Sequence, residues 1–374
     1  MNKKKAILSA LAIALIAILV VTLVRDDTNS GGGDLKAVAI LPLTGPAATF
    51  GQDEKAGIEL ALKSVTNPSV PISFTFEDSQ GKPDQAVSSL WKSFDLEGRH
   101  VVYVSTTGPS MAVLPILKDS QQPHLAFVIA TLSEMTKDFP SAYRIYPSVD
   151  EEIRCLAEYA EKAGIRRIAG YAVKNQAGED FIRKMDASAK KFGGSVVFSD
   201  TFEAGEKDYR QVLLKIKAAN AEAILITGYT FNYADIFRQM NEIDLKIPVL
   251  AGGGVALTDL KDIPPAFLQN VIFPASSLSF DPDRPQVHEF LSLAKASGVQ
   301  PNYEIAYAFD ATRLLQAAAD KANSAELEKI QAAIQELLPY EGVNGAIILD
   351  DNRDAILDLK ACRYGQHGIE IATK

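Results

Sequence analysis

Strand-like runs alternate with helical patterns through almost the whole sequence after residue 34, and this alternation limits the possible folds more than any other feature. The run Ala221–Thr227 (AEAILIT) has the continuous apolar character of a strand buried on both faces. The segment 52–65 instead spaces Ile58, Ala61 and Val65 as one face of a helix does. Further strand-like runs are Leu35–Leu43, Ile72–Glu77, Val101–Thr106, Leu125–Ala130, Arg167–Val173, Ile247–Leu250 and Val271–Phe273.

Strands that alternate with helices form parallel sheets covered by helices on both faces. A chain of 374 residues exceeds the usual size of one domain. We therefore expect an α/β fold with two doubly wound parallel-sheet lobes of similar size. Because such sheets bind ligands outside the carboxyl ends of their strands, we expect a site where the two lobes face each other.

The first residues carry a signal for export. Lys3, Lys4 and Lys5 precede an uncharged, apolar run over Ala6–Val24, which as a helix would be about 28 Å long, close to the thickness of the bilayer core. The basic flank predicts that the following residues leave the cytoplasm. Residues 1–24 fit either a cleaved signal peptide or a retained membrane anchor, and the missing Ala-x-Ala site favours the anchor. Residues 25–34, which include DDTNSGGG, are typical of a flexible tether.

Charge, histidines and cysteines exclude several classes of function. The 38 basic and 47 acidic residues give a formal net charge of −9, whereas a general nucleic-acid-binding protein needs a basic surface. The four histidines form no HxxxH or HExxH pair and neither cysteine is in a CxxC pair, so we expect no metal site. Cys155 and Cys362 fit either two buried free thiols or one disulfide.

The sequence lacks the motifs of the common α/β enzymes. It has no GxSxG nucleophile turn and no GxxxxGK[ST] phosphate-binding loop. After the first strand-like run the glycines are Gly45 and Gly51, which do not form GxGxxG. The triplet Gly252–Gly254 is typical of a turn with a close backbone approach, although a phosphate cradle is conceivable. We therefore expect no catalytic set and no cofactor.

Three of the expected strands run directly into hydroxyl side chains. Thr106 and Thr107 follow one strand, Thr131 follows a second, and Thr230 comes shortly after a third. Hydroxyls and free backbone N–H groups at such strand ends can hold a carboxylate without a basic side chain. Each hydroxyl alone also fits a simple helix cap, but three clusters at the predicted ligand-binding ends of the strands favour a binding site.

Several longer motifs together resemble one family. They are Val38–Gly57 (VAILPLTGPAATFGQDEKAG), Phe76–Gln85 (FEDSQGKPDQ), Ser105–Asp119 (STTGPSMAVLPILKD), Thr131–Thr136 (TLSEMT) and Ala204–Tyr209 (AGEKDY). From about Leu35 to the C-terminus, the chain resembles the branched-chain amino-acid (Leu/Ile/Val) binding proteins of ABC transporters, which have the type I periplasmic binding-protein fold.

The resemblance implies a Venus-flytrap, in which two lobes joined by a three-stranded hinge close on a small solute. It implies an N-terminal lobe of residues 35–147 plus 279–345 and a C-terminal lobe of residues 148–278 plus 346–374. Tyr143–Pro147 (YRIYP) is similar to the first crossover between the lobes. The implied partners are a small-molecule ligand and an ABC permease, the implied location is extracytoplasmic, and the N-terminal segment would reach the membrane.

The resemblance also implies roles for individual residues. Thr107 would donate its hydroxyl to a ligand carboxylate, Thr131 would offer its hydroxyl and backbone N–H, and Ile129 would offer its carbonyl. Phe50 and Tyr229 would form aromatic walls. The full set of expected ligand-binding residues is Phe50, Thr106, Thr107, Ile129, Ala130, Thr131, Ala177, Tyr229 and Gly253.

At two of these positions the chain departs from the family. Gly253 stands where the second lobe usually supplies an acid to the ligand's ammonium, and Ala177 replaces an aromatic residue before Gly178 and Glu179. A buried ammonium without a partner costs several kcal/mol. We therefore expect a carboxylate or amide ligand, namely an amino acid or an analogue without a free ammonium, or a bulkier ligand that fills the space at these two positions.

Two other classes of function fit parts of this pattern. A ligand-sensing ectodomain has the same fold, but the chain encodes no signalling domain, so a sensor would need a separate partner. An enzyme of the doubly wound class would need a nucleophile, a metal or a cofactor loop, and the motif search finds none.

Overall fold

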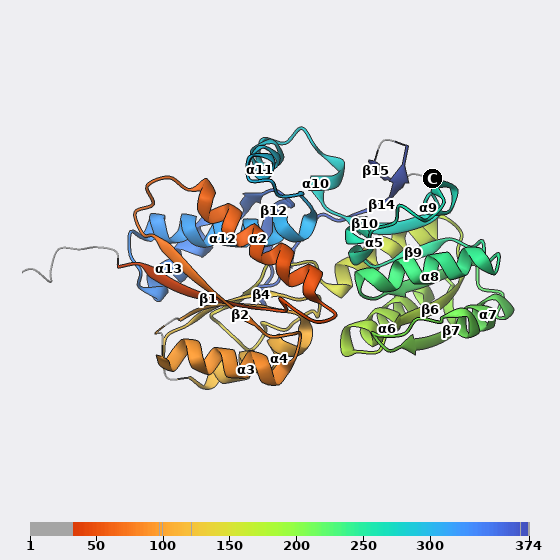
Figure 1. Cartoon of the computed structure of the whole chain (residues 1–374), viewed down its shortest axis with the longest axis horizontal. Helices are drawn as coiled ribbons and strands as arrows, with labels where there is room; N and C mark the ends of the chain where they lie inside the picture. The colour runs from red at the N-terminus through yellow and green to blue at the C-terminus, as the bar shows by residue number, and fades with distance from the viewer. Residues whose placement is uncertain (1–32, 97, 99, 121, 367, 373–374) are drawn as a thin grey trace, which may run out of the picture.

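The computed structural model describes residues 33–96, 98, 100–120, 122–366 and 368–372. The expected apolar segment 6–24 and the tether up to residue 32 lie outside the described residues. Among the described helices, none combines the length and apolar character needed to cross a membrane. The described chain forms two α/β lobes that lie side by side, with the N-terminal lobe on the left in Figure 1 and the C-terminal lobe on the right.

The sheet of the N-terminal lobe has five parallel strands in the order β2-β1-β3-β4-β5. Central strand β1 shows why helices cover both faces. Ala37 and Ala39 pack into one hydrophobic cluster, whereas Val38 and Ile40 pack into another on the opposite face. The strands are β1 (Leu35–Leu41), β2 (Ile72–Asp78), β3 (Val101–Ser105), β4 (Leu125–Ile129) and β5 (Ala142–Arg144).

Two groups of helices cover the faces of this sheet. The cluster of Ala37 includes Ile58, Leu314 and Ile330, which belong to α2, α12 and α13. The cluster of Val38 includes residues of α3 and α4. The helices are α2 (Ala48–Ser64), α3 (Pro83–Trp91) with the π-helical turn Lys92–Leu96, α4 (Thr107–Asp119), α10 (Ser277–Phe280), α11 (Pro285–Ala296), α12 (Tyr303–Ala322) and α13 (Leu327–Leu337).

The sheet of the C-terminal lobe has seven strands in the order β15-β14-β10-β9-β8-β6-β7. The strands from β10 to β7 are parallel, whereas β14 and β15 add an antiparallel edge. The elements are α5 (Val149–Lys162), β6 (Arg167–Val173), α6 (Gln176–Lys191), β7 (Ser195–Phe202), α7 (Arg210–Ala218), β8 (Ala223–Thr227), α8 (Thr230–Glu242), β9 (Val249–Ala251), the 3-10 helix Gly253–Leu257, α9 (Pro265–Leu268), β10 (Val271–Ala275), β14 (Lys360–Gly365) and β15 (Gly368–Ile371).

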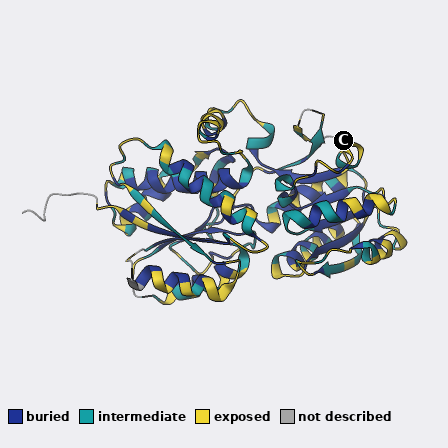
Figure 2. Cartoon of the chain, in the orientation of Figure 1, coloured by how far each residue is buried: buried dark blue, intermediate teal, exposed yellow. Residues whose placement is uncertain are grey.

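The chain passes between the lobes three times, after β5, after β10 and before β14. These passes run through the top centre of Figure 1, where the two lobes join. The sheets and the inner helix faces are buried, and the outer helix faces are exposed (Figure 2). The predicted α/β fold with two doubly wound sheets joined by a hinge is confirmed.

One part of the tail lies in a different lobe from the one expected. Strands β12 (Gly345–Leu349) and β13 (Ala355–Ile356) pair with each other beside β11 (Tyr340–Gly342). Their residues Ile347 and Ala355 bury against the core of the N-terminal lobe, although the expected division assigned residues from 346 onward to the other lobe. The tail reaches the C-terminal sheet only at β14, which pairs with β10. Cys155 and Cys362 are buried, free thiols.

Candidate ligand-binding cleft

A cavity of about 320 Å³ lies between the two lobes and is lined by residues of both. It is the place where the carboxyl ends of the parallel strands meet the starts of the following helices. All nine residues predicted from the sequence line it, namely Phe50, Thr106, Thr107, Ile129, Ala130, Thr131, Ala177, Tyr229 and Gly253.

The turn from β3 to α4 forms one wall of the cleft. Thr106 has a φ of +67°, which is rare for a residue with a side chain and costs about 1–3 kcal/mol. Its N–H donates to the carbonyl of Ile129 (2.9 Å) and its hydroxyl donates to the carbonyl of Ser105 (2.6 Å). No side chain caps the first turn of α4, so the helix presents its N-terminus, with Thr107 and Gly108, to the cavity.

The end of β4 lies beside this helix start. The carbonyl of Thr131 accepts the N–H of Val149 at the beginning of α5 (2.7 Å), which ties the cleft wall to the first crossover. The hydroxyls of Thr107 and Thr131 make no hydrogen bond with any other described residue. These two hydroxyls are therefore available to a ligand, whereas that of Thr106 is already used within the wall.

Phe50 lines the cleft near the start of α2, which packs very close to the preceding loop. A methyl group on Gly51 would lie 2.4 Å from the carbonyl oxygen of Pro42, so only glycine fits there. From the other lobe, Gly254 approaches the ring, since a methyl group on it would lie 3.7 Å from Cζ of Phe50. The lobes therefore meet across the cavity at this point.

The C-terminal lobe contributes the starts of α6 and α8. The side chain of Asn175 caps α6 by accepting the N–H of Gly178 (2.8 Å), and Ala177 lies in this first turn. Tyr229 precedes α8, and its ring stacks on that of Phe231. Burial raises the pKa of the Tyr229 hydroxyl above its ordinary value.

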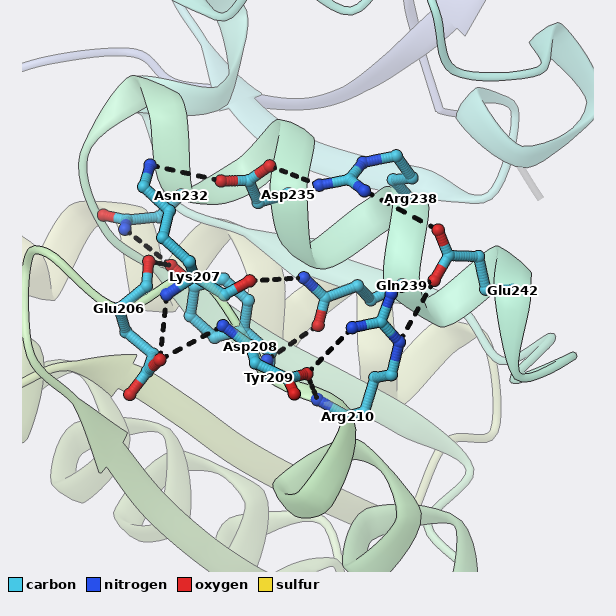
Figure 3. A network of polar contacts seen from close by, with 10 residues as sticks. All are labelled: Glu206, Lys207, Asp208, Tyr209, Arg210, Asn232, Asp235, Arg238, Gln239 and Glu242. Carbon is cyan, nitrogen blue, oxygen red and sulfur yellow. Dashed lines mark hydrogen bonds and ion pairs between the residues drawn. The ribbon is translucent and has the colours of Figure 1, made fainter.

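A polar network links α8 to the segment before α7 (Figure 3). The fully buried side chain of Asn232 accepts the N–H of Tyr229 (2.9 Å) and donates to the hydroxyl of Tyr209 (2.9 Å). Two helical turns further, Gln239 accepts the N–H of Tyr209 (2.7 Å) and donates to the carbonyl of Lys207 (2.7 Å). The motif Ala204–Tyr209, which contributed to the family resemblance, is therefore a support for the cleft wall.

The space beside Gly253 holds an acid that the sequence did not reveal. Glu152 of α5 accepts the backbone N–H of Gly253 with one carboxylate oxygen (3.2 Å), and its other oxygen has no hydrogen bond to a described residue. Burial raises the pKa of Glu152 to about 7. Gly253 does stand at the position where the family usually has an acid, but a carboxyl reaches the same space from a different helix.

Two further buried acids line the N-terminal lobe side. Glu54 of α2 accepts the hydroxyl of Ser105 (2.6 Å), and Glu304 of α12 accepts the hydroxyl of Tyr146 (2.8 Å). The two carboxyls lie against each other, and burial together with this like charge raises the pKa of Glu54 well above its ordinary value. The pair can hold one shared proton.

Sequence reasoning missed these three acids because it followed strand ends, and all three lie on helices. A signal was present in each helical pattern. Glu54 shares a face of α2 with Gly51, Gly57 and Ile58, and this face is buried. A charged residue on an otherwise apolar helix face indicates either a buried partner or a functional site.

Comparisons with known proteins agree with this geometry. The family described as "Periplasmic binding protein" matches residues 34–363. The Leu/Ile/Val-binding protein homolog 3 of Brucella melitensis is 23% identical over 328 residues, which make up 86% of this chain and 88% of the relative.

Two solved structures have the same fold. A solute-binding protein of an ABC transporter from R. palustris, in complex with 4-hydroxybenzoate, superposes with a TM-score of 0.79 at 19% identity, covering 91% of this chain and 96% of that one. The substrate-binding protein LivJ from Streptococcus pneumoniae, in complex with isoleucine, gives a TM-score of 0.78 at 18% identity, with coverage of 91% and 100%.

Proposed function

Because the chain belongs to the periplasmic binding protein family, we propose that it captures a small carboxylate- or amide-containing molecule between its lobes and delivers it to an ABC permease. Members of this family bind solutes and are not enzymes. The family is extracytoplasmic, in agreement with the export signal expected from residues 1–24. In this proposal the apolar run 6–24, if retained, holds the domain close to its permease.

One observation supports the carboxylate most directly. The uncapped N-terminus of α4 points into the cavity beside the unused hydroxyls of Thr107 and Thr131. A helix N-terminus carries partial positive charge, and hydroxyls donate strong hydrogen bonds to a carboxylate. Among the described lining residues there is no lysine, arginine or histidine, so an anion would bind to the N-terminus of α4 and to these hydroxyls.

The relatives bind ligands that share this group. The ligands in the two similar structures, 4-hydroxybenzoate and isoleucine, both carry a carboxylate, and only isoleucine carries an ammonium. The expectation of a ligand without an ammonium rested on the missing acid at Gly253. Because Glu152 fills that place, the argument against an amine loses its basis.

Scattering and calorimetry on residues 33–374 test the proposal. We expect a screen of carboxylates, amino acids and amino-acid amides to yield ligands that reduce the radius of gyration on binding. Thr107→Ala and Thr131→Ala should each reduce the affinity for a carboxylate ligand by roughly tenfold, because a hydrogen bond to a charged group is lost. Thr66→Ala, at an exposed loop position, is the control. Ligands held equally well by all three variants, or no contraction with any compound, would contradict the proposal.

A further inference from the structure

We infer that the cleft selects ligands of net positive charge, such as amino-acid amides or basic amino acids, and holds their ammonium between Glu152 of one lobe and the Glu54–Glu304 pair of the other. The inference rests on the proposed function and narrows its ligand class. Two observations support it: the acidic residues of the cavity wall, and carboxylate oxygens that accept no N–H or hydroxyl from the described residues.

The described lining residues include three acids and no base. When these acids release their protons, they place negative charge on both walls of the cleft. The buried cation Arg144 does not neutralise them, because it pairs with Asp354 (3.0 Å) and donates to the carbonyl of Tyr146. A zwitterionic ligand adds no net charge, so it leaves this negative charge uncompensated.

Two carboxylate oxygens in the wall lack a hydrogen-bond donor. Glu54 is 1% exposed, and apart from the proton that it can share with Glu304, its Oε2 receives no N–H or hydroxyl from any described residue. Glu152 uses only the oxygen that accepts the N–H of Gly253. A buried carboxylate oxygen such as Oε2 of Glu54 normally has a donor, and an ammonium supplies three N–H groups. A ligand ammonium would therefore complete both sets of contacts.

The two acidic groups also belong to different lobes. Glu54 and Glu304 lie on α2 and α12 of the N-terminal lobe, whereas Glu152 lies on α5 of the C-terminal lobe. A cation between them attracts both lobes at once, and closing the cleft strengthens that attraction by excluding water. The positive charge would thus favour the closed state in addition to binding.

Protonation links this binding to pH. The groups facing the three acids come from every neighbouring element: Asp53 of α2, Ser105 of β3, Tyr146 of the first crossover, Glu151 of α5, Tyr233 of α8, the N–H of Gly253 and Tyr303 of α12. Because these neighbours are acids or neutral donors, the empty cleft keeps protons on its carboxyls near neutral pH. An ammonium displaces such protons, so amine affinity should rise from about pH 6 to about pH 8.

Matched probe sets test the inference by calorimetry. One set is 4-methylpentanoate, leucine and leucinamide, a second is 3-phenylpropanoate, phenylalanine and phenylalaninamide, and lysine is added to both. We expect lysine or an amide to bind at least about tenfold tighter than the deaminated acid. Measurements in two buffers of different ionisation enthalpy should detect proton release. Amides that bind no tighter than the deaminated acids would overturn the inference.

Near-isosteric variants locate the charge. Glu152→Gln and Glu304→Gln should each reduce the affinity for the amide by about tenfold and reduce proton release on binding. The affinity for the deaminated acids should not fall. Glu158→Gln, on the exposed side of α5, is the matched control and should bind like the wild type. Equal losses for amides and acids would overturn the inference. If a variant fails to fold, the pH series on the wild-type protein decides.

The outcomes separate this inference from the proposed function. If the deaminated acids bind and contract the protein while lysine and both amides do not, the charge selection is wrong and solute capture stands. If no probe of any charge gives heat or contraction, both are contradicted.

Discussion

At the scale of single residues, Glu152 shows how one carboxyl can serve a site from an unexpected position. It lies on the buried face of α5, three residues after Val149, in a helix that starts at a capping box between Ser148 and Glu151. That helix begins directly after the first crossover, so its first turn projects toward the cleft. A methyl group on Gly253 would lie 3.4 Å from Oε1 of Glu152, at ordinary contact distance, so the carboxyl packs directly beside this glycine.

Burial of Glu152 makes stability depend on pH. Its pKa rises from an ordinary value of 4.5 to about 7, so the folded protein keeps a proton that the unfolded chain releases. This contribution is fully present below about pH 4.5 and is lost as the pH rises through about 7. We expect the free energy of unfolding of the empty protein to fall between about pH 5 and about pH 8. Glu152 accounts for at most about 3 kcal/mol of this decrease. Urea denaturation across this range measures it.

Glu152→Gln is the matching variant, because glutamine keeps the shape and stays neutral. It should flatten the pH dependence, whereas Glu158→Gln should leave it as in the wild type. An identical slope in wild type and Glu152→Gln would mean that Glu152 titrates in the folded protein as it does in the unfolded chain.

The difference between Thr107 and Glu152 explains how much of the site could be predicted. The hydroxyls of Thr107 and Thr131 follow strands directly, so local sequence and the rule for parallel sheets place them correctly in the cleft. The acids Glu54, Glu152 and Glu304 come from three distant segments. Only the packing of α2, α5 and α12 brings them together, and no local pattern encodes that packing.

At the scale of elements, the same contrast holds for the strands. The apolar runs of β1, β3, β4 and β8 predict central strands, because burial on both faces leaves a continuous apolar signature. Strand β7 is absent from the expected strands. It lies at the sheet edge and, among the described strands, pairs only with β6, so its residues are mostly half-buried and lack that signature.

Helices α2 and α12 pack closely at a glycine, and this contact positions much of the cleft. A methyl group on Gly57 would lie 2.2 Å from the carbonyl oxygen of Ile305 and 2.9 Å from Cβ of Ala308. In an isolated helix, replacing glycine with alanine stabilises by about 1 kcal/mol. Here we expect Gly57→Ala to destabilise by roughly 1–3 kcal/mol, because the helices must separate. Urea denaturation measures the change.

The substitution should also weaken ligand binding, since α2 carries Phe50 and Glu54 and α12 carries Glu304. Lys63→Ala, at an exposed position of the last turn of α2, provides the comparison and should change stability little. A stabilised Gly57→Ala protein would show that the two helices can move apart without cost.

The support of α8 makes a second prediction at this scale. Asn232 is fully buried and bonds Tyr229, Tyr209 and the carbonyl of Ala204 (3.2 Å). Asn232→Ala leaves these groups without partners, which should cost about 1–3 kcal/mol. Because Tyr229 loses its anchor, ligand affinity should also fall. Thermal unfolding and calorimetry together measure both effects.

Asn241→Ala is the control on the same helix, because Asn241 is exposed. It should match the wild type in both measurements. Full affinity in Asn232→Ala despite lower stability would separate the network in Figure 3 from the ligand site.

At the scale of the whole molecule, the hinge is held by a few buried polar groups that link the crossovers. Asp354 pairs with Arg144 and also accepts the hydroxyl of Thr136 (2.6 Å), joining the first crossover to the tail strands. Glu151 accepts the N–H groups of Ser148 and Leu357, which belong to the first and third crossovers. These contacts fix the base of the hinge, so bending must occur in the few residues between the lobes.

Closure then depends on how closely the opposite walls can approach. Gly254 of the C-terminal lobe faces Phe50 of the N-terminal lobe, and its neighbours are otherwise at ordinary contact distance. We expect the larger side chain of Gly254→Leu to limit closure of the lobes. Ligand affinity should fall by roughly tenfold, and the unfolding midpoint should stay near that of the wild type. Scattering should record a smaller contraction at saturating ligand.

Gly205→Leu, which adds the same side chain at an open position, should contract like the wild type. Unchanged contraction and affinity would mean that the lobes do not approach each other along the line from Phe50 to Gly254 when they close.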